Sequence, residues 1–560
     1  DGQLSIVFNG ELYNYIEIKA QLKDDYAFKT KTDTEVILAA YQKWGKNCLS
    51  KFNGMFAFAL YDHQKEELVL VRDRLGIKPL YLAQIGDQLI FSSEIRALLA
   101  SGLVPRKLNQ DALVDYLRYQ TVQGPFTLVE GVQLMPAGTM VTLSDNEMKT
   151  EVYWDLAANS SGKAQGQNTK EIQSEIREKL ARSVELRMRA DVPFGAFLSG
   201  GIDSSAIVGL MAEVSDNPVS TFSVTFDESE FSEARYAEIV AKKFNTKHHD
   251  IKLDVNDFRN MIPDALSAMD HPSGDGPNTY VVSKVTKASG ITMALSGLGG
   301  DELFGGYAIF KQAATLLDYK WAGSFPKFMR KAGGNLLQTL KPSVATEKMT
   351  GILSEDYLDL EHAYPWSRLV LSDNWVSDIT GRKVLPPNSV KEHLLKALEF
   401  GKAGFNLPYL SKVSLAEMDT YMQHVLLRDS DQMSMAHALE VRVPFLDHEL
   451  VEYVIGIPDP IKHPHTPKKL LVDALGDLLP SEIVHRPKMG FTLPWAIWMK
   501  EDLRSFCEEK LTNLGQREVF NNDAIQRLWS HFLNGTKHIS YSRIWHLVVL
   551  ENWMEEHGIQ

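Results

Sequence analysis

The spacing of hydrophobic and polar positions differs on the two sides of a polar stretch near residue 160. Before that stretch, short apolar runs such as Leu4–Phe8 and Met55–Tyr61 stand between turn residues, which is typical of strands. Met55–Tyr61 and Glu67–Arg72 flank a short polar segment, so this pair predicts a hairpin. We therefore expect an α+β layered domain over residues 1–156.

The second part of the chain shows a different rhythm. Residues 157–169 are polar, rich in small residues and without periodicity, which predicts a linker. Lys170–Met188 has the spacing of an amphipathic helix, and buried strands then alternate with helices until about residue 310. This alternation predicts a doubly wound parallel sheet. The chain beyond it has mostly helical spacing, so we expect one α/β domain with a helical C-terminal part over 170–560.

The clearest chemical signal follows the first buried strand of the second domain. The apolar run Phe194–Leu198 ends in Ser199–Gly201, Asp203–Ser205 follows, and Ala206–Ala212 has the pattern of the first turns of a helix. Glycines let the backbone take positive φ and come close to a ligand, and the N–H groups at a helix start attract anions. A tight turn with capping serines is the alternative. No Gly-Lys-Ser/Thr follows, so this is not a Walker A loop, but the combination favours a nucleotide pyrophosphate.

A second loop repeats this chemistry. Ser296–Asp301 also follows an apolar strand and combines small residues with an acid. Because ligands of such sheets lie at the carboxyl ends of the strands, we expect the two loops to meet. Asp203 and Asp301 would then hold Mg²⁺, with phosphate oxygens and waters completing an octahedron. A helix cap is the alternative for Asp301. His248 and His249 are adjacent on a strand and point to opposite faces, so we expect a structural role for them.

Composition narrows the classes of partner. The net charge of −13 argues against a nucleic-acid backbone as the main partner. The two cysteines form no framework of disulfides or metal ligands, which fits a reducing cytoplasm. No apolar run is long enough to span a membrane and no signal peptide is visible, so we expect a cytoplasmic protein without a membrane partner. The first residue is Asp1, directly before a strand-like run, and we expect a truncated or processed chain.

Four motifs of the first domain occur in a fixed order: Asn9–Asn14, the Asp33-Thr34-Glu35 helix start, Gly54–Ala59 and Arg72–Tyr81. Together they resemble the glutaminase half of class II (Ntn-type) glutamine amidotransferases. The resemblance implies that Asn9 and Gly10 help form an oxyanion hole, that Asp33 holds the α-amino group of glutamine, and that Glu11 belongs to the same site. Taken singly, Asn9-Gly10 is also typical of a hairpin turn and Asp33 of a helix cap.

The sequence departs from that family at the nucleophile. The family uses an N-terminal cysteine whose own amine is the base, whereas no cysteine precedes Cys48 here. Cys48 lies between a helical stretch and a strand, which is typical of a buried core residue. The arginine-glycine loop that binds the glutamine carboxylate is also missing upstream. We therefore expect that a chain with this sequence does not hydrolyse glutamine.

Motifs of the second domain resemble the synthetase half of glutamine-hydrolysing asparagine synthetases, which has a PP-loop fold of the adenine nucleotide alpha hydrolase type. The motifs are SGGIDSS, SGLGGDELFGGY, LEVRVPFLD and RPKMGF, in that order. The resemblance implies that Asp203 and Asp301 hold Mg²⁺ and that Lys488 stabilises charge during adenylation and amide formation. A lone lysine on such a loop is otherwise typical of a solvated surface. The residues implied to bind ATP are Phe197, Leu198, Ser199, Gly200, Gly201, Asp203, Ser204, Ser205, Val224, Ser296 and Gly297.

One position leaves the acceptor open. Asparagine synthetases carry an acid in the Ser-Gly-x-Gly loop, and this chain has Leu298, which can neither bind a cation nor take a proton. Three hypotheses follow: aspartate amidation with nitrogen from glutamine or ammonia, amidation of a uronic acid in polysaccharide synthesis, and an inactive homologue that binds or regulates. The first is the leading hypothesis. A homodimer is compatible with each of them.

Overall fold

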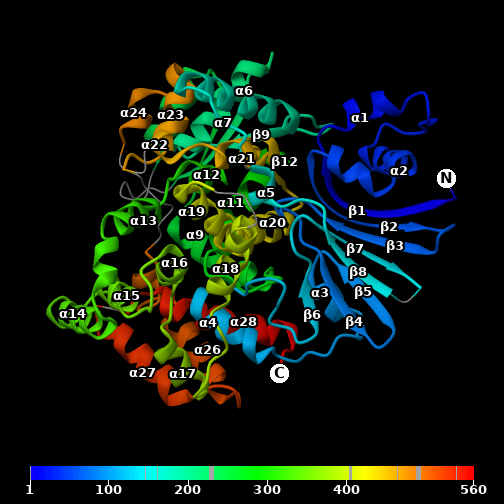
Figure 1. Cartoon of the computed structure of the whole chain (residues 1–560). Coiled ribbons are helices and arrows are strands. Elements are labelled where there is room, and N and C mark those ends of the chain that lie inside the picture. Colours follow the sequence, from blue (N-terminus) through cyan, green and yellow to red (C-terminus); the bar gives the residue numbers. More distant parts are fainter. Residues whose placement is uncertain are drawn as a thin grey trace.

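The computed structural model describes residues 2–145, 147–160, 162–225, 233–402, 407–462, 465–486, 494–537 and 539–560. Figure 1 shows a strand-rich N-terminal part on one side and a larger helical part on the other. None of the described helices is long and apolar enough to cross a membrane.

The N-terminal part is built on an antiparallel sheet of five strands in the order β1-β2-β3-β7-β8 and on a second sheet in the order β5-β4-β6. Two helices, α1 (Tyr15–Leu22) and α2 (Asp33–Trp44), pack their apolar faces against the first sheet. The α+β layered prediction is therefore confirmed. The strands are β1 (Leu4–Leu12), β2 (Gly54–Asp62), β3 (Glu67–Arg72), β4 (Tyr81–Ile85), β5 (Gln88–Ser92), β6 (Val132–Leu134), β7 (Thr139–Ser144) and β8 (Glu147–Val152).

Strand β1 is longer than the sequence pattern indicates. The Asn9-Gly10 pair does not turn; it stays in the strand, where Gly10 faces Phe56 of β2. Gly10 has a φ of +141°, and a Cβ atom there would lie 2.0 Å from the carbonyl oxygen of Met55. Glycine is therefore needed for close strand approach and not for a hairpin turn.

The second part is organised around a parallel sheet in the order β11-β10-β9-β12-β13. Every neighbouring pair in it is parallel, which confirms the predicted α/β sheet. Helix α7 follows β9 and helix α8 follows β10, as crossover connections require. The elements are β9 (Phe194–Phe197), α7 (Ile202–Val214), β10 (Ser220–Thr225), α8 (Ala234–Lys243), β11 (Lys247–Lys252), α11 (Gly276–Ala288), β12 (Met293–Leu295) and β13 (Glu440–Arg442).

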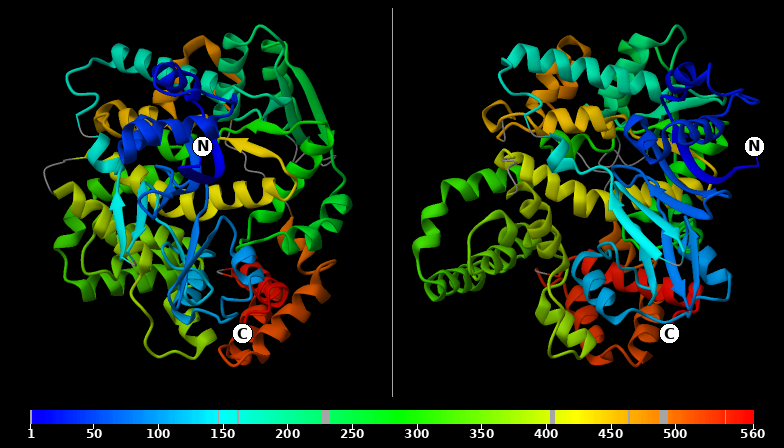
Figure 2. Two further views of the ribbon diagram at one scale, coloured as in Figure 1. Left: turned by 90° about the vertical axis from the view of Figure 1, so that its right-hand side faces the viewer. Right: turned by 45° about the vertical axis from the view of Figure 1, so that its right-hand side comes forward.

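Helices make up most of the remaining chain, as the spacing predicts. They include a pair, α14 and α15, that projects from the body of the molecule at the end of α13 (Figure 2). The elements not yet given are η1 (Gly45–Lys51), α3 (Ile95–Ala100), α4 (Gln110–Tyr119), α5 (Leu156–Ser160), α6 (Thr169–Arg187), α9 (Val255–Asn260), α10 (Ile262–Ser267), α12 (Gly300–Phe304), α13 (Ala308–Asp318), η2 (Lys320–Ser324), α14 (Lys327–Leu340), α15 (Val344–Leu353), α16 (Leu360–Arg368), α17 (Asp373–Thr380), α18 (Ser389–Lys402), α19 (Tyr409–Ala416), the π-helix η3 (Glu417–Leu426), α20 (Leu427–Met435), η4 (Pro444–Leu446), α21 (His448–Ile455), α22 (Asp459–Lys462), α23 (Lys469–Leu475), η5 (Gly476–Leu478), α24 (Ser481–Val484), α25 (Trp495–Trp498), α26 (Arg504–Gln516), α27 (Asn522–Leu533) and α28 (Ser542–His557).

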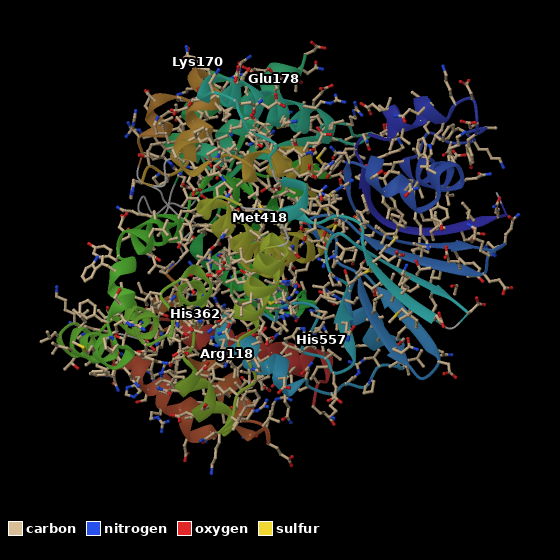
Figure 3. All side chains as sticks on the ribbon, in the orientation of Figure 1. Arg118, Lys170, Glu178, His362, Met418 and His557 are labelled. Carbon is tan, nitrogen blue, oxygen red and sulfur yellow. The ribbon has the colours of Figure 1, made fainter. Side chains whose placement is uncertain are left out.

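The two parts interdigitate. Helix α4, before the linker, lies among the C-terminal helices, and the Tyr116 hydroxyl donates to the carbonyl of His546 at 2.8 Å. The Arg118 guanidinium, also on α4, lies 2.8 Å from the Asp373 carboxylate, and Figure 3 places Arg118 near the helices around His557. One hydrophobic core therefore continues from the first part into the C-terminal helices.

Candidate active site

Two glycine-rich loops lie side by side at the carboxyl ends of neighbouring strands. Strands β9 and β12 pair in parallel, with Leu295 opposite Ala196, so the chain leaves both strands at the same edge of the sheet. Ser199–Gly201 then leads into α7, and Ser296–Gly299 leads into α12. The structure thus brings together the two loops that the sequence singled out.

The loops are close enough to exclude side chains at several positions. A Cβ atom at Gly300 would lie 2.5 Å from Oδ1 of Asp203, and one at Gly297 would lie 2.8 Å from Cβ of Asp203. Gly200 has a φ of +66°, and a Cβ there would lie 2.5 Å from Cβ of Tyr236. Real Cβ atoms do not approach that closely, so these glycines set the shape of the site.

Lys468 joins the two acidic residues of the loops. Its ammonium group lies 2.6 Å from Oδ1 of Asp301 and also contacts the Asp203 carboxylate. Burial opposes the charge on Lys468, but the two carboxylates outweigh it and raise its pKa to about 12. Asp203 and Asp301 therefore converge on one position, which the Lys468 ammonium occupies, and their role as Mg²⁺ ligands stays a prediction. Gly299, without a side-chain cap, precedes α12, so Asp301 is not the helix cap.

Hydroxyls line only part of the first loop. Ser199 is exposed, and its Oγ lies 3.2 Å from Oγ of Ser204. Ser205 is fully buried behind the loop, and Leu198 is buried in the hydrophobic core. Only the backbone of these two residues can therefore face a ligand at the loop. Phe197 and Val224, on neighbouring strands β9 and β10, are half-buried.

Arg486 lies beside the first loop, and sequence analysis gave it no role of its own. Its Nη2 donates to Oε1 of Glu233 at 2.5 Å and would lie 3.7 Å from a Cβ at Gly201. Its Nη1 is buried and has no hydrogen-bond partner among the described residues. A buried, unpaired guanidinium N–H beside an anion-binding loop suits a phosphate oxygen. Lys488, the predicted catalytic lysine, lies outside the described residues.

The carboxylates of Asp203 and Asp301 suit a hard cation, since Mg²⁺ prefers oxygen ligands. Within the described ranges, no group of three or more His, Cys, Asp or Glu side chains forms a metal site by itself. Any metal at this position would therefore need oxygens from a bound nucleotide and from water. His249 stacks on Phe222 at 4.9 Å, and Nδ1 of His248 lies 3.0 Å from Oγ1 of Thr221, which agrees with structural roles.

The residues predicted for glutamine binding also lie together. Asn9 donates from Nδ2 to Oγ of Ser93 at 2.9 Å, and Gly10 and Glu11 follow it in β1. Asp33 accepts from the N–H of Leu12 at 3.0 Å through Oδ2. The cap of α2 is Thr32, so the Asp33 carboxylate is not the helix cap.

Arg442 connects the two candidate sites. Its Nη2 lies 3.3 Å from Oε1 of Glu11, and its carbonyl accepts from the N–H of Ser296 at 2.8 Å. Burial raises the pKa of Glu11 to about 7, although Arg442 opposes this shift. The sequence placed Arg442 in a motif without showing that it contacts the N-terminal part.

Two further sequence predictions concern apolar environments. Cys48 is buried in the core of the N-terminal part, as predicted, and burial raises the pKa of its thiol to about 12. Leu298 is half-buried and packs against the core that includes Leu198 and Leu446. Its side chain therefore supplies no polar group to the second loop.

Comparison with known proteins agrees with this geometry. Residues 175–555 match the family model described as asparagine synthase, and residues 1–154 match the glutamine amidotransferase domain. Asparagine synthetase [glutamine-hydrolyzing] 1 of Bacillus subtilis is 31% identical over 98% of this chain and 85% of its own length. Amidase chry2 of Gibberella zeae is 30% identical over 91% of this chain and 80% of its own.

A solved structure of an allosteric regulatory enzyme of purine biosynthesis matches at 17% identity over 44% of this chain and 60% of that chain. Its TM-score is 0.21, which is too low to bear on the fold. The family models and the Bacillus relative together cover nearly the whole chain. The chain belongs to the asparagine synthase family and is a carbon–nitrogen ligase of that type, with a glutamine amidotransferase domain before the synthase domain.

Proposed function

We propose that the chain forms an amide from a carboxylate, with ATP as the energy source and glutamine as the nitrogen donor of the complete protein. The contact between the two strand-end loops carries this proposal, because it puts Asp203 and Asp301 around one cationic position. A nucleotide whose phosphates lie on the first loop would have its α-phosphate near the second. An acceptor carboxylate would reach that phosphate from the side of α12.

The reaction that fits this arrangement has two steps. A carboxylate oxygen of the acceptor attacks the α-phosphorus of ATP, pyrophosphate leaves, and an acyl adenylate forms. Ammonia then attacks the acyl carbon, loses a proton, and AMP leaves. The backbone N–H groups of Ser199–Gly201 and the Arg486 guanidinium would bind the pyrophosphate. Asp203 and Asp301 would hold Mg²⁺, which would supply charge neutralisation on the phosphates when bound.

Lys488 would stabilise the charge that develops on the acyl group. In the N-terminal domain, Asn9 and Gly10 would form the oxyanion hole, while Glu11 and Asp33 would bind glutamine. Ser93, the hydrogen-bond partner of Asn9, also lines a cavity that reaches Arg428 and Asp431 in the helical part. The cavity lies between the two parts of the chain, so the proposed transfer of ammonia would begin there.

Aspartate is the first acceptor that we propose, in line with the names of the asparagine synthetases that the chain resembles. A sugar acid is the second, and Leu298 favours it, because an apolar side chain replaces the acid that asparagine synthetases carry in this loop. The match to a protein named amidase fits either acceptor.

Pyrophosphate release separates these acceptors. Purified protein receives ATP, Mg²⁺ and ammonium chloride, with aspartate, glucuronic acid or galacturonic acid as the acceptor. Ammonium chloride makes the assay independent of glutamine hydrolysis. We expect acceptor-dependent release that is lost in Asp301→Asn, with amide product confirmed by mass spectrometry. Release without any dependence on an acceptor, or none at all although ATP–Mg²⁺ binds, would refute the proposed ligase activity.

A further inference from the structure

The projecting helix α14 turns its apolar face to solvent. Its inner side, which packs on α15, carries Arg330 and Gly334, and these are the residues of the helix that are buried. Gly334 would place a Cβ 3.0 Å from Thr350, so this contact is tight and uses small groups. The polar and small face is therefore inside, which reverses the usual arrangement of a surface helix.

The outer face of α14 is a continuous apolar stripe. Phe328, Leu336 and Leu340 stand at helical spacing, and Phe328 is 72% exposed while Leu340 is 69% exposed. Tyr319, Trp321 and Phe325 of the preceding turn are also exposed, and their rings contact one another in series. The large exposed apolar side chains of η2, α14 and their flanking residues are Tyr319, Trp321, Phe325, Phe328, Met329, Leu336, Leu337 and Leu340. Such a concentration of exposed apolar side chains in one segment marks an interaction site.

The charge of this segment is opposite to that of the molecule. Residues 319–346 contain five basic residues and no acidic residue, in a chain with a net charge of −13. Asp318 and Glu347 stand just outside these bounds. Lys331 and Lys341 are exposed on α14 and at its end. Arg330 is used internally, since it donates to backbone carbonyls such as that of Glu355, and Lys327 pairs with the Asp356 carboxylate at 2.7 Å.

We propose that η2 and α14 form a docking face for an anionic lipid bilayer, with α14 lying in the plane of the membrane surface. An apolar stripe with aromatic residues beside basic residues is the pattern of interfacial helices, in which lysines meet the lipid phosphates. A second copy fits less well, because a symmetric contact would bring two basic faces together. The lack of a spanning helix among the described residues does not bear on contact of this kind, in which a helix lies on the membrane surface.

Docking in this way would hold the synthase domain at the membrane. Helix α13 begins shortly after Asp301 and leads directly to the projecting pair, which stands away from the N-terminal part in Figure 2. The face is therefore free of the other domain. The inference concerns location and stands independently of the proposed amidation reaction.

Sedimentation with vesicles tests the proposal. Purified protein is mixed with large unilamellar vesicles of 70:30 phosphatidylcholine and phosphatidylglycerol, or of phosphatidylcholine alone, and the bound fraction is measured. We expect binding to the anionic vesicles that weakens with salt and is much weaker on neutral vesicles. The variant Phe328→Ser/Leu336→Ser/Leu340→Ser should lose about tenfold or more in partition coefficient, because each side chain contributes apolar burial.

A matched control variant tests whether vesicle binding depends on this face or on exposed apolar side chains in general. The variant Val7→Ser/Val152→Ser/Val384→Ser removes three apolar side chains that are as exposed but lie elsewhere, and it should bind vesicles like the parent. A thermal melt of each variant checks folding. A site-specific readout is available because both native cysteines are buried. A fluorophore on Leu336→Cys should shift to the blue with anionic vesicles, whereas one on Val384→Cys should not.

Three results would overturn the proposal. They are no binding to anionic vesicles, equal binding of the α14 variant and the control, and self-association that the α14 variant abolishes. The last result, measured by light scattering during gel filtration, would assign the face to a second copy of the chain.

Discussion

Replacement of Lys468 by methionine tests whether Asp203 and Asp301 form a cation site. Lys468 is buried, with 8% of its side chain exposed, and both carboxylates contact its ammonium group. The variant keeps the volume of the side chain but leaves two carboxylates facing each other without a counter-charge. The structure therefore predicts that the ligand-free variant is less stable than the parent. It also predicts that Mg²⁺ stabilises the variant more than it stabilises the parent.

The size of the expected loss of stability follows from the burial of Lys468 and its two partners. Removing one partner of a fully buried ion pair costs about 3–5 kcal/mol. The two carboxylates keep 16% and 20% exposure, so water screens part of the repulsion. We expect the lower end, about 3 kcal/mol, which corresponds to roughly 6 °C in the unfolding midpoint of a large domain. A divalent cation can occupy the position that the ammonium leaves, so Mg²⁺ should restore most of this loss.

Thermal unfolding with and without 10 mM Mg²⁺ is the assay, with Lys469→Met as the matched control. Lys469 is 39% exposed and pairs with Asp473 one helical turn away, so its loss should cost about 0.5 kcal/mol or less. The reasoning is refuted if Lys468→Met melts like the control. It is also refuted if Mg²⁺ raises the midpoints of parent and variant by the same amount.

The remaining predictions concern three other positions. Gly300→Ala should reduce ammonia-dependent pyrophosphate release by about tenfold or more, because its Cβ would lie 2.5 Å from Oδ1 of Asp203; unchanged release would contradict the loop contact. Burial raises the pKa of Asp429 to about 7, so its contribution to stability is present below about pH 4 and lost as pH rises through 7. Between pH 4 and 8, the free energy of urea unfolding of Asp429→Asn should rise relative to that of the parent by up to about 4 kcal/mol. A difference between the two proteins that does not change with pH would refute this. Arg442→Gln should impair glutamine-dependent amidation in the complete protein more than ammonia-dependent amidation, because it removes the contact with Glu11; equal losses in paired assays would exclude a coupling role.

The geometry of the nucleotide site follows from sequence because two simple rules act together. Apolar runs such as Phe194–Leu198 predict buried strands, and the ends of parallel strands meet at one edge of the sheet. These rules place Asp203 near Asp301 although the two are far apart in the sequence. The strands that precede the two loops are therefore sufficient to predict that the loops lie side by side.

Residues from the helical part could not be placed in the same way. Lys468 and Arg486 come from loops without strand neighbours, and no local pattern indicates where their side chains point. The backbone N–H groups of the first loop predict an anion site. They do not indicate that a buried guanidinium lies beside it. Tertiary contacts also overrode a local preference at Asn9-Gly10, where pairing with β2 keeps the backbone extended.

The face of α14 shows a further limit of periodicity. The spacing of Phe328, Leu336 and Leu340 predicts an amphipathic helix, and the ordinary assumption turns that stripe inward. The structure instead buries Arg330 and Gly334. Periodicity identifies the apolar face of a helix. It does not show whether that face points to the core or to solvent, because this depends on the residues of the neighbouring helix. The absence of acidic residues from positions 319–346 of the sequence is a signal that indicates this exposure.

Buried charges hold the two parts of the chain in one arrangement. Nζ of Lys78 lies 2.7 Å from Oδ1 of Asp431, and the Asp447 carboxylate accepts from both Arg187 and Asn53. Such pairs add little net stability, because desolvation offsets the attraction between the charges. Separating the parts would nevertheless leave Lys78 and Asp431 without each other and would remove the Asn53 amide from the Arg187–Asp447 pair. The pairs therefore select one relative orientation more than they strengthen the fold. The amidation proposed above, with glutamine as nitrogen donor, needs such a fixed orientation, because ammonia formed in one part would have to reach the other.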